Sequence, residues 1–250
     1  MPKIVSVHSF RGGTGKSNTS ANLAALCAAR GLRVGVVDTD IQSPGIHVLF
    51  GLQEGSVHHS LNDFLWGKCQ IQETAHDVTA AAGSVPGRIF LIPSSIKAGE
   101  ITRILREGYD VALLSDGFQR LVEELHLDVL IIDTHPGLNE ETLLSIAVSD
   151  VLLLILRPDN QDYQGTGVTV EVSRKLRVPN LLLLVNKAPA SFDLGALQSK
   201  VQQTYNTEVA AVIPHSDEMM ALASAGLFVI KYPDHPVTAL FRQVAERVLG

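Results

Sequence analysis

Short runs of β-branched residues and leucine recur along the chain and alternate with longer segments in which apolar residues repeat every three or four positions. A short, continuously apolar run is typical of a strand buried on both faces of a parallel sheet, and the longer repeat is typical of a helix. Strands are predicted at 3–9, 33–38, 88–92, 128–133, 150–156, 180–186 and 209–213, with a weaker one at 228–231. Helices are predicted at 16–30, 138–148, 162–176, 194–205, 218–225 and 237–249. This alternation predicts an α/β fold with a mostly parallel sheet of seven to eight strands and helices on both faces.

Local signals agree with these elements. Gly31 and Gly226 lie where a helix would end in a left-handed cap, and Asp217 is placed to cap the helix that follows it. Residues 51–87 form the one long stretch without clear periodicity, so this is where we expect partner-specific variation.

Size and composition favour one domain over residues 1–250. The chain has 250 residues, of which 46% are hydrophobic and 18% charged, enough for one large core. Its apolar runs are far shorter than the ~20 residues of a membrane span, and no charged leader precedes an apolar segment. Cys27 and Cys69 are too few for a disulfide framework or a four-thiolate metal site. We therefore expect a cytoplasmic protein with reduced thiols.

The charge balance argues against a surface that coats nucleic acid. Lysine and arginine total 20 against 26 acidic residues, which gives a net charge of −6. One dense basic run remains, formed by Arg174, Lys175 and Arg177, and its default interpretation is a solvated helix end. Non-specific DNA binding through such a local patch therefore stays open.

A glycine-rich loop follows the first predicted strand and opens the first predicted helix. It consists of Arg11, Gly12, Gly13, Thr14, Gly15, Lys16 and Ser17, with Asn18 next. Glycines let backbone amides wrap a phosphate at the positive end of a helix. Lys16 would add a cation between the β and γ phosphates, and the Ser17 hydroxyl would be a ligand of Mg²⁺. The loop is a variant P-loop, because Phe10 stands where the usual pattern has glycine.

Acidic residues end two of the predicted strands. Asp38 and Asp40 follow the second strand, at the carboxyl edge where α/β proteins bind ligands. We assign Asp40 to the attacking water and Asp38 to the water shell of the metal, against the alternative of turn residues. Asp133 ends the apolar strand 128–133 in a Walker B arrangement, where Mg²⁺ would offset its burial. The loop after it, with Pro136 and Gly137, is a candidate switch that senses the γ phosphate.

These motifs resemble the deviant Walker A ATPases of the MinD/ParA group, and the MinD-like branch fits best. The glycine-rich loop, the D-x-D of 38–40, the D-x-x-P-G of 133–137, and residues 51–52 with 61–67 carry the resemblance, which covers nearly the whole chain. It implies a P-loop NTPase that binds and hydrolyses ATP with Mg²⁺ as a homodimer with ATP at the interface. The family's signature lysine, which reaches the partner's phosphates, falls on Arg11, and a solvated arginine is the alternative.

The resemblance also implies how the base is bound. Asn186, after the sixth expected strand, and Pro214, after the seventh, match the positions that contact adenine in the family. Asn186 has the alternative of a loop residue that bonds the backbone.

Two features of some relatives are missing. The predicted last helix repeats Leu240, Val244 and Val248 like a helix packed on a core, so we do not expect stable membrane anchoring through a basic amphipathic tail. The C-x-x-C pair of related iron–sulfur carriers is also missing.

The preferred interpretation is a slow ATPase of the positioning or partitioning type, stimulated by a protein partner that acts on the dimer. The alternative is a metabolic P-loop enzyme, an ATP-dependent ligase or kinase, which would need substrate-binding charges in 51–87. That region offers mainly His58, His59 and Lys68, with Arg88 just beyond it. A non-hydrolysing homologue is disfavoured by Lys16, Asp40 and Asp133.

Overall fold

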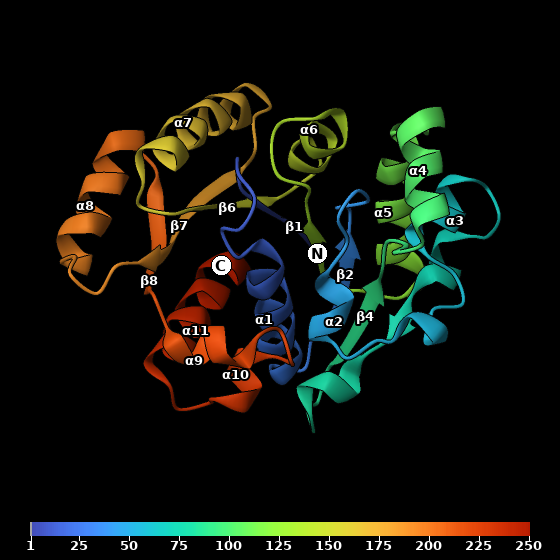
Figure 1. Ribbon diagram of the computed structural model, residues 1–250, viewed down its shortest axis with the longest axis horizontal. Coiled ribbons are helices and arrows are strands. Elements are labelled where there is room, and N and C mark those ends of the chain that lie inside the picture. Colours follow the sequence, from blue (N-terminus) through green and yellow to red (C-terminus); the bar gives the residue numbers. More distant parts are fainter. Residues whose placement is uncertain (1) are drawn as a thin grey trace.

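Eight strands form one sheet in the computed structural model, which describes residues 2–250 (Figure 1). Their order across the sheet is β3-β4-β2-β5-β1-β6-β7-β8. Every pairing is parallel except that of β3 with β4. The strands are β1 (Lys3–His8), β2 (Arg33–Asp38), β3 (His76–Asp77), β4 (Arg88–Ile92), β5 (Val129–Asp133), β6 (Val151–Leu156), β7 (Asn180–Ala188) and β8 (Glu208–Pro214).

Helices cover both faces of this sheet. They are α1 (Lys16–Ala29), α2 (Ile46–Leu49), α3 (Leu61–Leu65), α4 (Ala98–Glu107), α5 (Ala112–Glu124), α6 (Glu140–Ala147), α7 (Asn160–Lys175), α8 (Leu194–Tyr205), α9 (Asp217–Leu222), α10 (Phe228–Lys231) and α11 (Pro236–Leu249). In Figure 1, α1 and α11 lie on one side of the strands, and α5, α6, α7 and α8 lie on the other. The predicted α/β fold with helices on both faces is confirmed.

Successive residues of a strand contribute their side chains alternately to the two hydrophobic cores on either side of the sheet. On β1, Val5 and Val7 join the core that contains α1 and α11. Their neighbour Ile4 belongs to the opposite core, under α3 and α5. Because successive side chains of a strand point to opposite faces, a run apolar at every position is what a sheet covered on both sides requires.

The last helix, α11, contacts the first strand, β1. Lys3 Nζ donates hydrogen bonds to the carbonyls of Val248, at 3.2 Å, and Leu249, at 2.5 Å. An ammonium at this end of a helix complements its negative pole. The contact holds the C-terminal end of α11 against the start of β1, the strand that leads into the glycine-rich loop.

Residues 228–231 are a helical turn and not the weak strand predicted there. Three apolar residues followed by a lysine are too few to distinguish a strand from a buried helical turn. Here Phe228 and Val229 are buried against α1, and the Val229 amide donates to Asn22 Oδ1 at 2.9 Å. The eighth strand is instead β3, two residues within the stretch 51–87 that shows no periodicity.

Residues 93–127 have no predicted element, although they form α4 and α5. The helical signal is present there, since Leu114, Phe118 and Leu121 repeat at four and three positions and are buried.

The capping predictions are confirmed at one of three places. Gly31 follows α1 with φ +86°, in the left-handed region. At α9, however, the cap is Ser216, whose hydroxyl accepts from the Met219 amide, and Asp217 is the first helical residue. That helix ends at Leu222, and its left-handed cap is Ala223, three residues before Gly226.

Gly87 should tolerate no side chain. A Cβ atom there would lie 2.2 Å from the Leu32 carbonyl oxygen and 2.6 Å from that of Ala28, both of them backbone. We expect Gly87→Ala to lower the free energy of unfolding by roughly 2 kcal/mol or more in urea denaturation. The reason is that the backbone at Ala28 and Leu32 would have to move away from the new Cβ atom. Gly99→Ala is the matched control, since it faces open space in α4 and should be neutral or stabilising. Equal stability of the two variants would contradict the prediction.

A buried histidine should make stability depend on pH. His8 is fully buried at the end of β1, with Nδ1 2.7 Å from Thr134 Oγ1. Burial, with Lys16 and His135 nearby, lowers the pKa of His8 from 6.5 to about 3. Below pH 6.5 the unfolded chain binds a proton that the folded chain does not, so the free energy of unfolding falls as pH falls.

We expect His8 alone to cost roughly 2 kcal/mol of stability between about pH 7 and pH 5. Urea denaturation of His8→Asn over this range should show a correspondingly shallower loss than the wild type. His58→Asn, at an exposed histidine, controls for the substitution. An unchanged slope in His8→Asn would show that another group causes the pH dependence.

Candidate functional site

The glycine-rich loop joins the end of β1 to the start of α1. Gly13 and Gly15 have φ of +75° and +101°, a region that favours glycine, so the loop turns tightly into the first helical residue, Lys16. The Lys16 side chain is largely buried, with 7% of the residue exposed. Amides, helix pole and ammonium therefore converge as the sequence predicts for an anion site.

One cleft is lined by residues from three segments. Its lining includes Gly12, Gly13, Gly15, Lys16, Ser17, Asn18, Asp40, Ser43, His135 and Pro136. The loops after β1, β2 and β5 thus meet at the carboxyl edge of the sheet, where the strand order reverses around β1.

Two predicted metal-site carboxylates lie side by side beneath this cleft. Asp38 and Asp133 are direct register partners on β2 and β5, and each is 1% exposed. Ser20 Oγ donates to Asp133 Oδ1 at 2.9 Å, and the amides of Asp40 and Gly45 donate to Asp38 at 3.0 and 3.3 Å. The pair is held by hydrogen bonds, but its charges remain close together.

The pKa values of these groups show that negative charge is concentrated in this cluster. Burial raises the pKa of Asp133 to about 6, although hydrogen bonds from Ser17 and Ser20 oppose the shift. Burial, then Asp133 and Asp40, raises the pKa of Asp38 well above its usual value. Burial lowers the pKa of Lys16, against the attraction of these carboxylates. A divalent cation would stabilise both aspartates in their charged form, so Ser17, Asp38 and Asp133 fit magnesium.

Phosphate would have to complete that coordination. Among residues 2–250, no three His, Cys, Asp or Glu side chains are arranged to hold a metal ion by themselves. A cation that keeps water and phosphate ligands is typical of magnesium in nucleotide sites.

Asp40 and the loop after β5 are in contact. Asp40 Oδ1 accepts from the Ser43 amide at 3.1 Å and lies 3.8 Å from His135 Nε2. Burial raises the pKa of Asp40, with His135 as the largest opposing influence. The sequence analysis predicts no role for His135, because its proximity to Asp40 depends on two loops separated by about a hundred residues.

A second cleft adjoins the first. Gly15 and Asn18 line both clefts, and the second also contains Asn186 and Pro214, the two residues predicted to contact the base. Asn186 Nδ2 donates to the Thr14 carbonyl at 2.7 Å, so this side chain bonds the backbone as well as lining the cleft. Lys187, for which the sequence analysis predicts no role, lines this cleft too.

Arg11 lies outside both clefts. Its Nη1 donates to Gln161 Oε1 on α7 and is 3.9 Å from Asp162 Oδ1. Phe10 packs beside it, so close to α7 that a Cβ on Gly165 would overlap the ring. Arg11 therefore faces outward along α7, away from the phosphate loop of its own chain.

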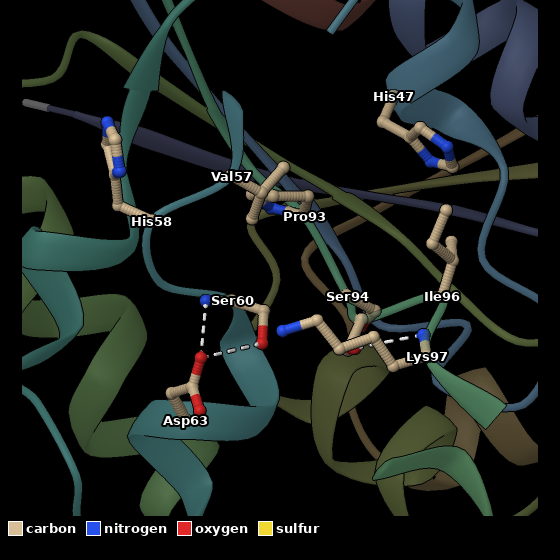
Figure 2. A pocket seen from close by; sticks show the side chains of 10 residues that line it. His47, Val57, His58, Ser60, Asp63, Pro93, Ser94, Ile96 and Lys97 are labelled. Carbon is tan, nitrogen blue, oxygen red and sulfur yellow. Dashed lines mark hydrogen bonds between the residues drawn. The ribbon is translucent and has the colours of Figure 1, made fainter. Parts of the chain in front are cut away.

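A further hollow lies beyond the end of β4, lined by His47, Val57, His58, Ser60, Asp63, Pro93, Ser94, Ser95, Ile96 and Lys97 (Figure 2). Figure 2 shows Asp63 bonded to both the amide and the hydroxyl of Ser60. Ser94 Oγ donates to the Asp38 carbonyl at 2.7 Å. The hollow thus adjoins the loop that carries Asp40, but these polar groups are already used within the protein.

Among the described residues, no helix combines the length and apolar character needed to cross a membrane.

Known proteins resemble this chain along its whole length. A family model described as an AAA domain matches residues 2–180. An uncharacterized ATP-binding protein of Methanocaldococcus jannaschii is 27% identical, over 100% of this chain and 89% of that protein. An iron-sulfur cluster carrier protein of Pseudomonas fragi is 29% identical, over 97% of this chain and 83% of its own.

The fold has solved counterparts. The septum site-determining protein MinD of Pyrococcus horikoshii, complexed with Mg-ADP, superposes with a TM-score of 0.81 over 99% of this chain and 96% of its own, at 20% identity. The family match over residues 2–180 shows that the chain belongs to the AAA-domain family, and its relatives and solved counterparts include MinD and ParA-family proteins.

Proposed function

We propose that this protein is a slow, partner-stimulated ATPase that works as a dimeric switch to position or partition a cellular cargo. One observation carries the proposal. The phosphate loop, Lys16 and Asp40 line one cleft, which adjoins the cleft that contains Asn186 and Pro214. The charges of the buried pair, Asp38 and Asp133, act on Lys16 in the first cleft.

Each residue has a definite task in this proposal. Amides of residues 12–18 and Lys16 bind the phosphates, while Ser17, Asp38 and Asp133 hold magnesium directly or through water. Magnesium supplies charge neutralisation at the β and γ phosphates. Asp40, at the cleft surface, orients the attacking water and accepts its proton. Asn186 and Pro214 contact the adenine ring from the second cleft.

The switch follows from the contact between loops. Asp40 and His135 belong to two loops that both face the phosphate cleft, so a γ phosphate would alter both together. The outward direction of Arg11 suits a group that reaches the phosphates of a second protomer. Hydrolysis would then separate the dimer, and a partner protein that orders these loops would set the rate.

The cysteines and the basic run favour a positioning role in the cytoplasm over an iron–sulfur carrier or a protein that binds DNA strongly. Both cysteines are free thiols, and Cys27 is buried in the core between α1 and the sheet. That burial does not suit an iron–sulfur carrier. In the dense basic run, Arg174 bonds the carbonyls of Tyr205 and Asn206, which leaves Lys175 and Arg177 as its cations for DNA.

The metabolic alternative would use the hollow beyond β4, which contains His58 and Lys97. Asp63 there caps α3 and pairs with Lys68, and Ser94 holds the Asp38 carbonyl. We therefore favour the switch.

Two substitutions should separate nucleotide binding from turnover. We expect Lys16→Ala to weaken MgATP binding at least about tenfold, because a charged hydrogen-bonding group is lost. Asp40→Ala should bind MgATP nearly as the wild type does, with turnover reduced about a hundredfold or more. Calorimetry and steady-state ATPase assays measure these effects, with Lys175→Met as an exposed control. Absence of MgATP binding by the folded wild type would refute the proposed function.

ATP should close the dimer through Arg11. In the Asp40→Ala background, light scattering after size exclusion should find a dimer with ATP and a monomer with ADP. Adding Arg11→Ala should return the ATP form to a monomer, because the partner's phosphates lose a cation. Adding Arg11→Lys should preserve dimerisation at least in part. A dimer that is indifferent to Arg11→Ala would remove this residue from the mechanism, and a monomer in all states would remove the switch.

A further inference from the structure

The strand β7 ends in an irregularity that points two residues at the phosphate loop. Pairing between β7 and β8 shifts register between Val185 and Ala188, so Asn186 and Lys187 fall outside the regular ladder. Lys187 adopts φ +55°, the left-handed region that residues with a side chain seldom occupy. Irregular strand positions beside a site commonly redirect side chains.

Both redirected side chains bond carbonyls of the phosphate loop. Lys187 Nζ donates to the Gly13 carbonyl at 2.8 Å, and Asn186 Nδ2 donates to the Thr14 carbonyl at 2.7 Å. The Lys187 amide in turn donates to Asn186 Oδ1 at 2.9 Å, which fixes the orientation of the Asn186 side chain. A Cβ on Gly15 would lie 2.5 Å from Asn186 Nδ2, so the approach requires glycine.

These bonds fix the direction of two consecutive peptide groups. In a planar trans peptide the C=O and N–H bonds point in opposite directions. A carbonyl of Gly13 drawn toward Lys187 therefore turns the Thr14 amide to the other side. Likewise, a carbonyl of Thr14 drawn toward Asn186 turns the Gly15 amide away from β7.

We propose that Lys187 is a positioning residue that, with Asn186, sets the phosphate loop for nucleotide before any nucleotide is present. Its ammonium acts on the loop's carbonyl and not on the phosphates themselves. The stem of the same side chain lines the base cleft, so one residue serves both parts of the site. This inference rests on the proposed nucleotide binding.

The first test needs no nucleotide. In the free protein, ¹⁵N relaxation of the Thr14 and Gly15 amides should report an ordered loop in the wild type and in Lys187→Arg, which keeps a charged donor. Lys187→Met keeps most of the stem and removes the donor, so both amides should become mobile or broadened. Lys175→Met is the matched surface control. Equal order in wild type and Lys187→Met would overturn the inference whatever the protein binds.

The second test measures affinity. Lys187→Met should weaken MgADP and MgATP by the same factor, about three- to tenfold, because both ligands use the preset amides. Lys187→Arg should restore the affinity. A loss that disappears in about 1 M salt would reveal plain attraction to the phosphates and overturn the positioning role. A wild type that binds neither nucleotide would instead refute the proposed function, leaving the relaxation result to decide on Lys187.

Discussion

Three carboxylates crowded around one lysine are the constraint on which the site depends. Asp38 and Asp133 face each other at adjacent strand ends, Asp40 lies just above them, and all three have a raised pKa. Lys16 offsets this negative charge only in part, because its own pKa is lowered by burial. The negative charge of the three carboxylates thus exceeds what Lys16 neutralises, and a magnesium ion bound with phosphate would balance it.

The loops around that centre are linked to one another by few but directed contacts. His135 adjoins Asp40 from the strand that carries Asp133, and Ser94 holds the backbone of Asp38 from β4. Asn186 reaches the glycine-rich loop from β7. The ends of five strands, β1, β2, β4, β5 and β7, therefore define the geometry of one small region, so a change in one loop affects its neighbours.

Local patterns predicted the parts of this structure that short segments determine. The glycine-rich loop, the D-x-D segment and the apolar strands are each complete in a few residues, and the structure places Lys16, Asp40, Asn186 and Pro214 around adjoining clefts. The strand predicted at α10 is wrong, because the surroundings of its three apolar residues, and not their pattern, determine their conformation. The contacts of His135 and Lys187 depend on long-range loop positions, and no motif in a single sequence marks them.

The position of β1 in the sheet has a consequence for biosynthesis. This strand is made before its register partners on β5 and β6, since Lys3 pairs with Val129 and Val5 with Val151. More than a hundred further residues must therefore be synthesised before the strand that precedes the glycine-rich loop has a neighbour. Such distant pairings slow folding and leave hydrophobic strands exposed while translation continues. A nascent chain therefore forms the cleft around its glycine-rich loop only after β5 has been made, and until then β1 remains an unpaired apolar segment.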